Sequence, residues 1–255
     1  MGQKTKIDWC DSTWNPITGC LHGCPYCYAA RMARRFAGKK RIITGHDHLY
    51  ILDDPARKSD GAINPYPYGF DPTFHKYRLK IPQEWEKSQT IFVCSMADMF
   101  GEWVPDDWID HILTACLAAP QHRYLFLTKN GGRYTELAHK GILVNRENFW
   151  YGCSVPTPET PFWWADEYNT FASIEPILEP FDFKEADMEP DSVPDWIIVG
   201  AETGNRKGKI KPKKDWIDGI VRACNERKIP LFMKESLRDL MGVDFRQEFP
   251  WEARI

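Results

Sequence analysis

Short apolar runs alternate with longer amphipathic stretches from residue 90 onward. The runs are rich in β-branched and aromatic residues and lack regular polar alternation, which is typical of parallel strands covered by helices. They read TIFVCS at 90–95, RYLFLT at 123–128, FWYGCSV at 149–155, TFASIEPI at 170–177, WIIVG at 196–200 and PLFMK at 230–234. The pattern predicts successive βα units.

Two of the intervening stretches, 106–119 and 215–228, have the spacing of amphipathic helices. The apolar positions that share a face are Trp108, Ile109, Ile112, Leu113 and Cys116 in the first stretch, and Trp216, Ile217, Ile220, Val221 and Cys224 in the second. We expect both faces to be buried, which makes Cys116 and Cys224 core residues.

A further run at 13–18 brings the predicted strands to about seven, close to the eight of a complete barrel. We therefore predict an α/β fold, a partial or near-complete TIM-like (β/α) barrel of about 6–8 parallel strands, built by residues 1–255 as a single domain. An open doubly wound sheet is the alternative, but no glycine-rich turn directly follows the first run.

Residues 39–88 interrupt the βα rhythm, because they are long for a connection and rich in Pro, Gly, Asp and aromatic residues. They predict a loop insertion. The segment is either an excursion over the end of the barrel where substrate enters or a variable surface insertion.

Composition narrows the class of protein. The chain has 255 residues, of which 43% are hydrophobic and 27% charged, with a formal net charge of -3. A chain of this composition can bury a substantial core. It lacks the overall basic charge of non-specific nucleic-acid binders, although its net charge is compatible with a local basic patch. Because no long uncharged apolar stretch and no leader pattern occurs, we expect a cytoplasmic protein without a membrane partner.

Three of the eight cysteines, Cys20, Cys24 and Cys27, fall within GCLHGCPYCYAARMARR. The flanking glycines and proline disfavour helix before Cys27, so we expect an irregular loop followed by a helix. Such a loop can surround one iron–sulfur cluster. Because a cubane cluster takes four thiolates, three from the protein leave one iron open, as in a catalytic metal site.

The alternative for these cysteines is a zinc site with Cys10 or His22 as fourth ligand. Zinc usually takes two separated ligand pairs, and a second pair is missing here. Spacing favours the cluster but leaves zinc open.

The C-x3-C-x2-C spacing, with Tyr26 before the last cysteine, resembles the signature of the radical S-adenosylmethionine superfamily. Other segments resemble a phage-associated family of unknown function: DW at 8–9, TWNP at 13–16, TGC at 18–20, the Pro72 to Pro82 stretch, VCSMADMFGEWVP, LFLTKN, SIEPIL, IIVGAETG and PLFMK. The superfamily resemblance implies an enzyme with a [4Fe–4S] cluster on the three cysteines. Reductive cleavage of S-adenosylmethionine would give a 5′-deoxyadenosyl radical that abstracts hydrogen from a substrate, with a flavodoxin- or ferredoxin-type electron donor.

Ligands of such barrels bind at the carboxyl ends of the strands, so polar residues there are candidates for binding S-adenosylmethionine. The segment Ser95, Met96, Ala97 and Asp98 stands where the superfamily typically carries Gly-Gly-Glu, and this sequence departs from that pattern. The Asp98 carboxylate and the backbone at Met96 and Ala97 would bind the methionine ammonium group.

The other candidate positions lie at later strand ends: Lys129, Ser154, Glu175, Gly200, Glu202 and Lys234. Lys129 would pair with the methionine carboxylate or is a solvated lysine. The superfamily resemblance implies that Ser154 binds the ribose. Glu175, inside an apolar run, requires a ligand or partner. The turn at Glu202 either approaches a nucleoside or caps a helix. We expect these residues and the cysteine loop to face one barrel mouth.

Cys94 and Cys153, near strand ends, are candidate hydrogen donors to a substrate radical, or are small buried hydrophobes. The many aromatic residues suggest stacking surfaces and hence a nucleotide or nucleic-acid substrate. The competing function is a non-catalytic, phage-associated binding protein with a zinc- or cluster-stabilised loop.

Overall fold

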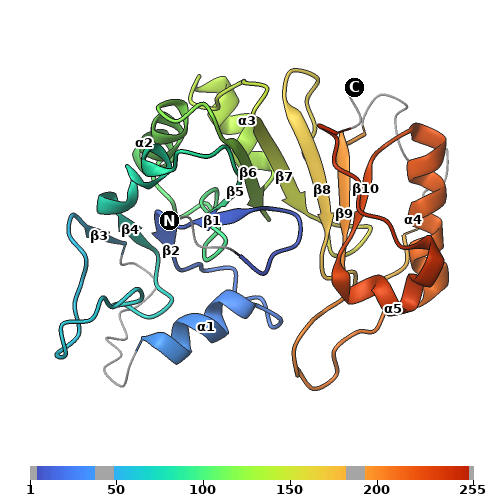
Figure 1. Cartoon of the computed structure of the whole chain (residues 1–255), viewed down its shortest axis with the longest axis horizontal. Helices are drawn as coiled ribbons and strands as arrows, with labels where there is room; N and C mark the ends of the chain where they lie inside the picture. The colour runs from blue at the N-terminus through green and yellow to red at the C-terminus, as the bar shows by residue number, and fades with distance from the viewer. Residues whose placement is uncertain (1–4, 38–48, 182–192, 253–255) are drawn as a thin grey trace. The chain divides into compact units, whose positions relative to one another are not determined.

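The computed structural model describes residues 5–37, 49–181 and 193–252, and the chain divides into two compact units, residues 1–144 and 145–255. Seven strands in these ranges follow the predicted parallel pattern, with helices between them (Figure 1). The α/β class, a partial TIM-like barrel, is therefore confirmed. That residues 1–255 form a single domain stays a prediction.

The first unit is built on a sheet of three parallel strands in the order β1-β5-β6. The bounds are Ser12–Trp14 for β1, Thr90–Val93 for β5 and Arg123–Thr128 for β6. The helices that follow are α2 (Asp106–Leu117) and α3 (Gly132–His139). All four residues of β5 are buried, as expected for an inner strand of a parallel sheet.

Helix α2 forms where the apolar spacing predicts it. Pro105 precedes it, and Asp106 and Asp107 occupy its first turn, where carboxylates interact favourably with the helix dipole. The five predicted core positions are at most 3% exposed, and Cys116 is fully buried. The helix ends at Leu117, shortly before Pro120.

The prediction of one strand at 13–18 is wrong. The run divides into β1 and a second strand, β2 (Ile17–Thr18), which belongs to a different sheet. The break falls at Asn15 and Pro16: proline has no N–H for a ladder, and the carbonyl of Asn15 accepts a hydrogen bond from Arg78 Nη1 at 2.8 Å. The carbonyl of Pro16 accepts from His75 N at 2.7 Å, which redirects the chain into the second sheet.

The predicted insertion at 39–88 forms the rest of this small sheet, although 39–48 lie outside the described residues. Strands β3 (Tyr50–Leu52) and β4 (Thr73–His75) give the order β2-β4-β3. Strand β4 runs antiparallel to β2 and parallel to β3, and is followed by the short helices η1 (Lys76–Arg78) and η2 (Ile81–Glu84). The described part of the insertion therefore pairs with the strand that leads into the cysteine loop.

His75 makes this small sheet sensitive to acid. Its ring is fully buried, with Nε2 2.9 Å from Thr18 Oγ1 and Nδ1 3.3 Å from the hydroxyl of Tyr77. Burial, together with the positive charge of Arg78, lowers the pKa of His75 to about 3. Unfolded histidine has a pKa near 6.5, so the unfolded chain binds the proton first as the pH falls.

The free energy of unfolding is therefore expected to fall by up to about 1.4 kcal/mol per pH unit between pH ~6.5 and ~3 through His75 alone. Above that window the contribution is constant. Urea unfolding at several pH values checks it, with His75→Gln as comparison. Since glutamine does not titrate, the variant should have the shallower pH slope; parallel slopes would contradict the assignment.

The second unit is a sheet of four parallel strands in the order β7-β8-β9-β10. Their bounds are Phe149–Ser154, Asn169–Ile174, Trp196–Val199 and Leu231–Met233. Helix α4 (Lys214–Arg227) precedes β10, and η3 (Glu235–Leu237), α5 (Arg238–Met241) and η4 (Gly242–Asp244) follow it. Each strand matches its predicted run to within a few residues.

Aromatic side chains fill the core of this unit. Trp196 is fully buried and contacts Trp150, Phe171 and Phe232 with ring centroids 5.7–6.5 Å apart. On α4, Ile217, Ile220 and Cys224 are buried as predicted, whereas Trp216 and Val221 stay partly exposed. No helix in the described ranges has the length and apolar character needed to cross a membrane.

Candidate functional site

The cysteine loop connects β2 to α1 (Tyr28–Phe36) and is fixed at its start by backbone contacts. Gly19 N–H donates to the carbonyl of Met96 at 2.9 Å, and Cys20 N–H donates to that of Phe70 at 3.1 Å. Gly19 has φ +90°, and a Cβ there would lie 2.2 Å from the carbonyl oxygen of Asp71. Only glycine fits this position, so the loop begins in a defined place.

Cys27 ends the loop and caps the helix that follows. Its Sγ accepts a hydrogen bond from Ala30 N–H at 3.3 Å, and its own N–H donates to the carbonyl of Cys24 at 3.1 Å. The predicted helix start after Cys27 is confirmed. Ala29 and Ala33 bury the inner face of α1 against Tyr66 and Met96, which anchors the helix.

Cys20, Cys24 and Cys27 are free, partly buried thiols. Burial raises the pKa of Cys20 to about 12, and the charges of Asp98 and the other two cysteines act in the same direction. Burial also raises the pKa of Cys24, opposed by the positive charge of Lys129. Without a bound cation, these two thiols are protonated at neutral pH.

Asp98 fastens the cysteine loop to the ends of two strands. Its Oδ2 accepts hydrogen bonds from His22 Nε2 at 2.7 Å, Thr128 Oγ1 at 3.0 Å and Lys129 N–H at 2.9 Å, while Oδ1 accepts from Phe100 N–H at 3.0 Å. The residue is 5% exposed. One buried carboxylate thus joins the loop, the segment after β5 and the end of β6.

Aromatic rings support both neighbours of this carboxylate. The ring of His22 packs edge-on against Trp103, with centroids 4.9 Å apart. Lys129 Nζ lies 5.4 Å from the ring centroid of Tyr26 and 3.3 Å from its hydroxyl. The predicted candidate Lys129 therefore lies beside the cysteine loop, and it affects the pKa of Cys24.

The segment from Cys94 to Ala97 is held from β1 and α1. Asn15 Oδ1 accepts from Met96 N–H at 2.9 Å and from Ser95 Oγ at 3.2 Å, and the hydroxyl of Tyr28 donates to the carbonyl of Ser95 at 2.5 Å. Cys94 takes a left-handed φ of 58°, which turns the chain directly after β5. Its thiol is buried, and burial raises its pKa to about 12.

Sequence reasoning did not find the positioning roles of Asn15, Tyr26 and His22. In the sequence, Asn15 is noted only as part of a segment that resembles the phage-associated family. Tyr26 is noted as part of the superfamily signature, and His22 as an alternative zinc ligand. All three lie within or just before the cysteine motif, so their closeness to it in sequence was the available signal.

In the second unit, three predicted candidates meet at the ends of neighbouring strands. Glu175 Oε1 accepts from Lys234 Nζ, and Gly200 lies beneath the lysine, where a Cβ would approach Lys234 Cδ to 2.8 Å. The expected partner of Glu175 is therefore Lys234. The missing side chain at Gly200 lets the lysine stem cross β9.

The other candidates of this unit lie near the same strand ends. Glu202 is 6% exposed and pairs with Arg206 through two hydrogen bonds of 2.6 Å, which holds the pKa of Glu202 below its usual range. Cys153 and Ser154 end β7 and are both buried. It stays a prediction that these residues and the cysteine loop face the same end of the barrel. The roles of Cys94 and Cys153 as hydrogen donors also stay predictions.

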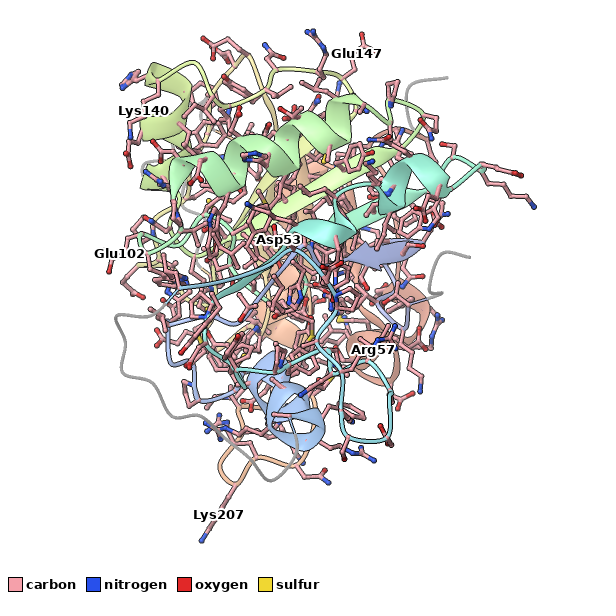
Figure 2. The ribbon with its side chains drawn as sticks, turned by 90° about the vertical axis from the view of Figure 1, so that its left-hand side faces the viewer. Asp53, Arg57, Glu102, Lys140, Glu147 and Lys207 are labelled. Atoms are coloured by element: carbon pink, nitrogen blue, oxygen red, sulfur yellow. The ribbon has the colours of Figure 1, made fainter. Side chains whose placement is uncertain are left out.

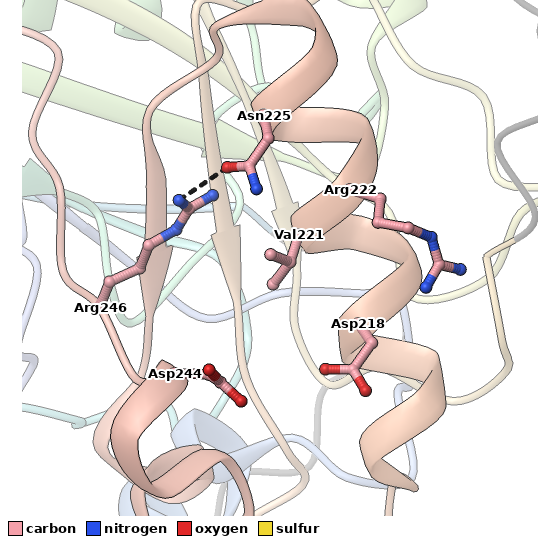
Figure 3. A pocket seen from close by; sticks show the side chains of 6 residues that line it. All are labelled: Asp218, Val221, Arg222, Asn225, Asp244 and Arg246. Atoms are coloured by element: carbon pink, nitrogen blue, oxygen red, sulfur yellow. Dashed lines mark hydrogen bonds between the residues drawn. The ribbon is translucent and has the colours of Figure 1, made fainter.

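A surface hollow of about 450 Å³ lies along α4 (Figure 3). It is lined by Asp218, Val221, Arg222, Asn225, Asp244 and Arg246. Arg246 Nη1 donates to Asn225 Oδ1 at 2.9 Å across it. The lining contains none of the predicted site residues.

In the part of the chain that the structure describes, no three His, Cys, Asp or Glu side chains form a group that would hold a metal ion. A four-iron cluster makes a different demand, because each cysteine binds a different iron. The loop suits such a cluster chemically: it offers three partly buried thiols, an N–H donor on Cys27 Sγ and a cation, Lys129, near Cys24. Donors and cations of this kind stabilise thiolate sulfur.

Fold and site together define an α/β partial-barrel protein with a three-cysteine loop fastened to the ends of its parallel strands. The chain belongs to the family described as "Protein of unknown function (DUF5131)", whose model matches residues 4–238.

Among solved structures, spore photoproduct lyase complexed with dinucleoside spore photoproduct is similar, with 10% sequence identity and a TM-score of 0.52 over 92% of this chain and 79% of that chain. A point mutant of the lyase gives a TM-score of 0.50 at 10% identity, covering 91% and 78% of the two chains. At this identity the likeness shows the fold alone. A search of curated proteins finds no significant match.

Proposed function

We propose that this protein is a radical S-adenosylmethionine enzyme whose [4Fe–4S] cluster is held by Cys20, Cys24 and Cys27. The observation that carries the proposal is the cysteine loop: three thiols whose segment is fastened through His22 to the buried carboxylate of Asp98. The likeness in fold to spore photoproduct lyase supports it.

Cys20, Cys24 and Cys27 would hold the cluster by three of its four irons, and the cluster with bound S-adenosylmethionine would supply a 5′-deoxyadenosyl radical when reduced by a flavodoxin- or ferredoxin-type donor. The protein's own residues would bind and orient S-adenosylmethionine. In the segment Ser95, Met96 and Ala97, the backbone at Met96 and Ala97 would bind the methionine ammonium group, with the Met96 carbonyl also accepting from Gly19 N–H. Lys129 offers a cation for the methionine carboxylate. Asp98 holds the backbone of Lys129 in place by accepting its N–H.

The second unit would contribute to binding through Ser154, Glu175, Gly200, Glu202 and Lys234. Ser154 offers a hydroxyl for a ribose, and the Glu175–Lys234 pair offers both charges to a polar ligand. Cys94 and Cys153 are the thiols proposed to return hydrogen to a substrate radical. Both are buried, so this role requires substrate to reach β5 and β7.

The substrate class proposed is a nucleotide or nucleic acid. The support is the dinucleoside photoproduct named for the similar lyase structure, together with the aromatic content of this chain. The oxygen-sensitive chemistry requires a reducing compartment, which agrees with the cytoplasmic location expected from the sequence.

The test is anaerobic reconstitution with iron and sulfide. About four irons per chain, a [4Fe–4S] absorption and EPR signature, and reductant-dependent formation of 5′-deoxyadenosine are expected. Chromatography quantifies the nucleoside, and a reaction without reductant is the control. Stoichiometric zinc in place of iron, or a fully loaded protein that forms no 5′-deoxyadenosine with oligonucleotides present, would refute the proposal and favour the non-catalytic binding protein.

A further inference from the structure

The loop between β9 and α4 carries the densest positive charge among the described residues of the second unit. Between Thr203 and Asp215 there is no acidic residue and there are six basic ones, in a chain whose net charge is -3. They are Arg206, Lys207, Lys209, Lys211, Lys213 and Lys214. Composition alone hides this patch, because acidic residues elsewhere outweigh it.

The loop has a defined conformation. Arg206 is clamped by the buried carboxylate of Glu202, and Lys209 N–H donates to the carbonyl of Arg206 at 3.3 Å to close a turn. Gly208 takes φ +74° within that turn, and Lys209 Nζ donates to the carbonyl of Gly204 at 3.1 Å. The turn presents Lys207 at its tip, where the side chain extends away from the ribbon (Figure 2).

Not all the cations in this loop are neutralised by neighbours. Arg206 pairs with Glu202, and Lys214 pairs with Asp218 and Asp244. Lys207, Lys211 and Lys213 are exposed, and within the described ranges no carboxylate forms an ion pair with them. Three spaced, solvated cations, of which Lys207 is on a turn held by hydrogen bonds, match the repeating charge of a phosphodiester backbone.

We propose that the loop from Thr203 to Lys213 binds the phosphate backbone of a polynucleotide. The inference rests on the proposed function and deepens it, because it makes the substrate a nucleic-acid strand rather than a free nucleotide. The loop starts three residues after Gly200, which lies beneath the Glu175–Lys234 pair. The start of the loop therefore lies next to the candidate site residues of the same unit.

The test compares two triple variants of the full chain that lose the same net charge. Lys207→Gln/Lys211→Gln/Lys213→Gln removes the loop cations, and Lys58→Gln/Lys80→Gln/Lys87→Gln removes three exposed lysines of the first unit. Fluorescence anisotropy measures the binding of single-stranded DNA, duplex DNA and RNA of about 16 nucleotides. Salt is varied between about 50 and 200 mM.

The loop variant is expected to bind at least one polynucleotide on the order of a hundredfold more weakly near 0.1 M salt. Its slope of log affinity against log salt should fall by about 3, one for each phosphate that the loop no longer neutralises, while the control variant stays close to wild type. Equal weakening in both variants, no weakening in either, or tighter binding of anionic phospholipid vesicles than of oligonucleotides would overturn the proposal.

The same preparations separate this inference from the proposed function. Substrate-independent formation of 5′-deoxyadenosine reports the cluster chemistry, and the loop variant should leave it unchanged. Loop-dependent binding without 5′-deoxyadenosine would refute the enzyme and keep the nucleic-acid surface. Formation of 5′-deoxyadenosine without loop-dependent binding would refute the nucleic-acid surface and keep the enzyme.

Discussion

Cys24→Ala is expected to lower the iron content of the anaerobically reconstituted protein from about four atoms per chain to a small fraction of that. Reductant-dependent 5′-deoxyadenosine should fall to the background of the reaction without protein. The physical reason is that two thiolates from the loop cannot replace three, and the protonated thiol of Cys20 is a poor ligand until cluster charge offsets its burial. Iron analysis and chromatography measure both results.

Cys27 allows the ligand role to be separated from a structural one. Because its Sγ accepts the Ala30 N–H at the start of α1, Cys27→Ala should also lose about 1 kcal/mol of helix capping. Cys27→Ser restores a capping acceptor and is expected to remain without iron. If the serine variant recovered both stability and cluster, the thiol would be a cap and not a ligand.

Cys116→Ala is the matched control in the same unit. Cys116 is fully buried on α2, away from the loop in sequence, and its truncation leaves a small cavity. The unfolding free energy should fall by about 1–2 kcal/mol while iron content and 5′-deoxyadenosine formation are retained. Loss of iron in this variant as well would mean that Cys24→Ala loses iron because the protein is less stable, and not because a ligand is missing.

The strands and the helix after Cys27 could be predicted from the sequence because their signals are local. The run RYLFLT coincides with β6 at 123–128, and the flanks of the cysteine motif set the start of α1. The division at Asn15 and Pro16 has one local signal, the proline, but the strand pairing that follows it could not be foreseen. It depends on the Asn15 carbonyl, which accepts from Arg78, 63 residues away in sequence, and on the Pro16 carbonyl, which accepts from His75 N–H.

In the candidate site too, local signals could be predicted and long-range contacts could not. Glu175 and Lys234 were predicted as candidates because they lie at strand ends, but the sequence does not show that they pair with each other, 59 residues apart. Asp98 was selected for the same reason, as a ligand for S-adenosylmethionine. Its hydrogen bond to His22 spans 76 residues, and only the fold shows that this carboxylate acts on the loop itself.

Asp98→Ala is the second variant with a large expected effect. It leaves four donors without their acceptor in a buried place: His22, Thr128 and the N–H groups of Phe100 and Lys129. The unfolding free energy should fall by about 3 kcal/mol or more, measured by urea unfolding of the metal-free protein. Because the loop loses its anchor, reconstituted cluster iron should pass to a chelator about 10–100-fold faster.

Asp106→Ala is the control for Asp98→Ala, because Asp106 also binds side chains of the same unit, in ion pairs with Arg133 and Lys140, but is more exposed. Chelator transfer should stay at the wild-type rate in this variant. Thr128→Val removes one of the four donors and should give an intermediate rate. The graded series distinguishes a loop anchor from general loss of stability, since Asp106→Ala also removes charge pairs.

The chelator rate also separates the two roles assigned to Asp98. A carboxylate that only bound the methionine ammonium group would, when removed, raise the KM for S-adenosylmethionine and leave iron transfer unchanged. The geometry predicts instead that iron transfer to the chelator accelerates in Asp98→Ala, even without S-adenosylmethionine, because the His22 contact exists in the protein alone. Unchanged iron transfer with a raised KM would return Asp98 to the ligand-binding role and make the His22 contact incidental.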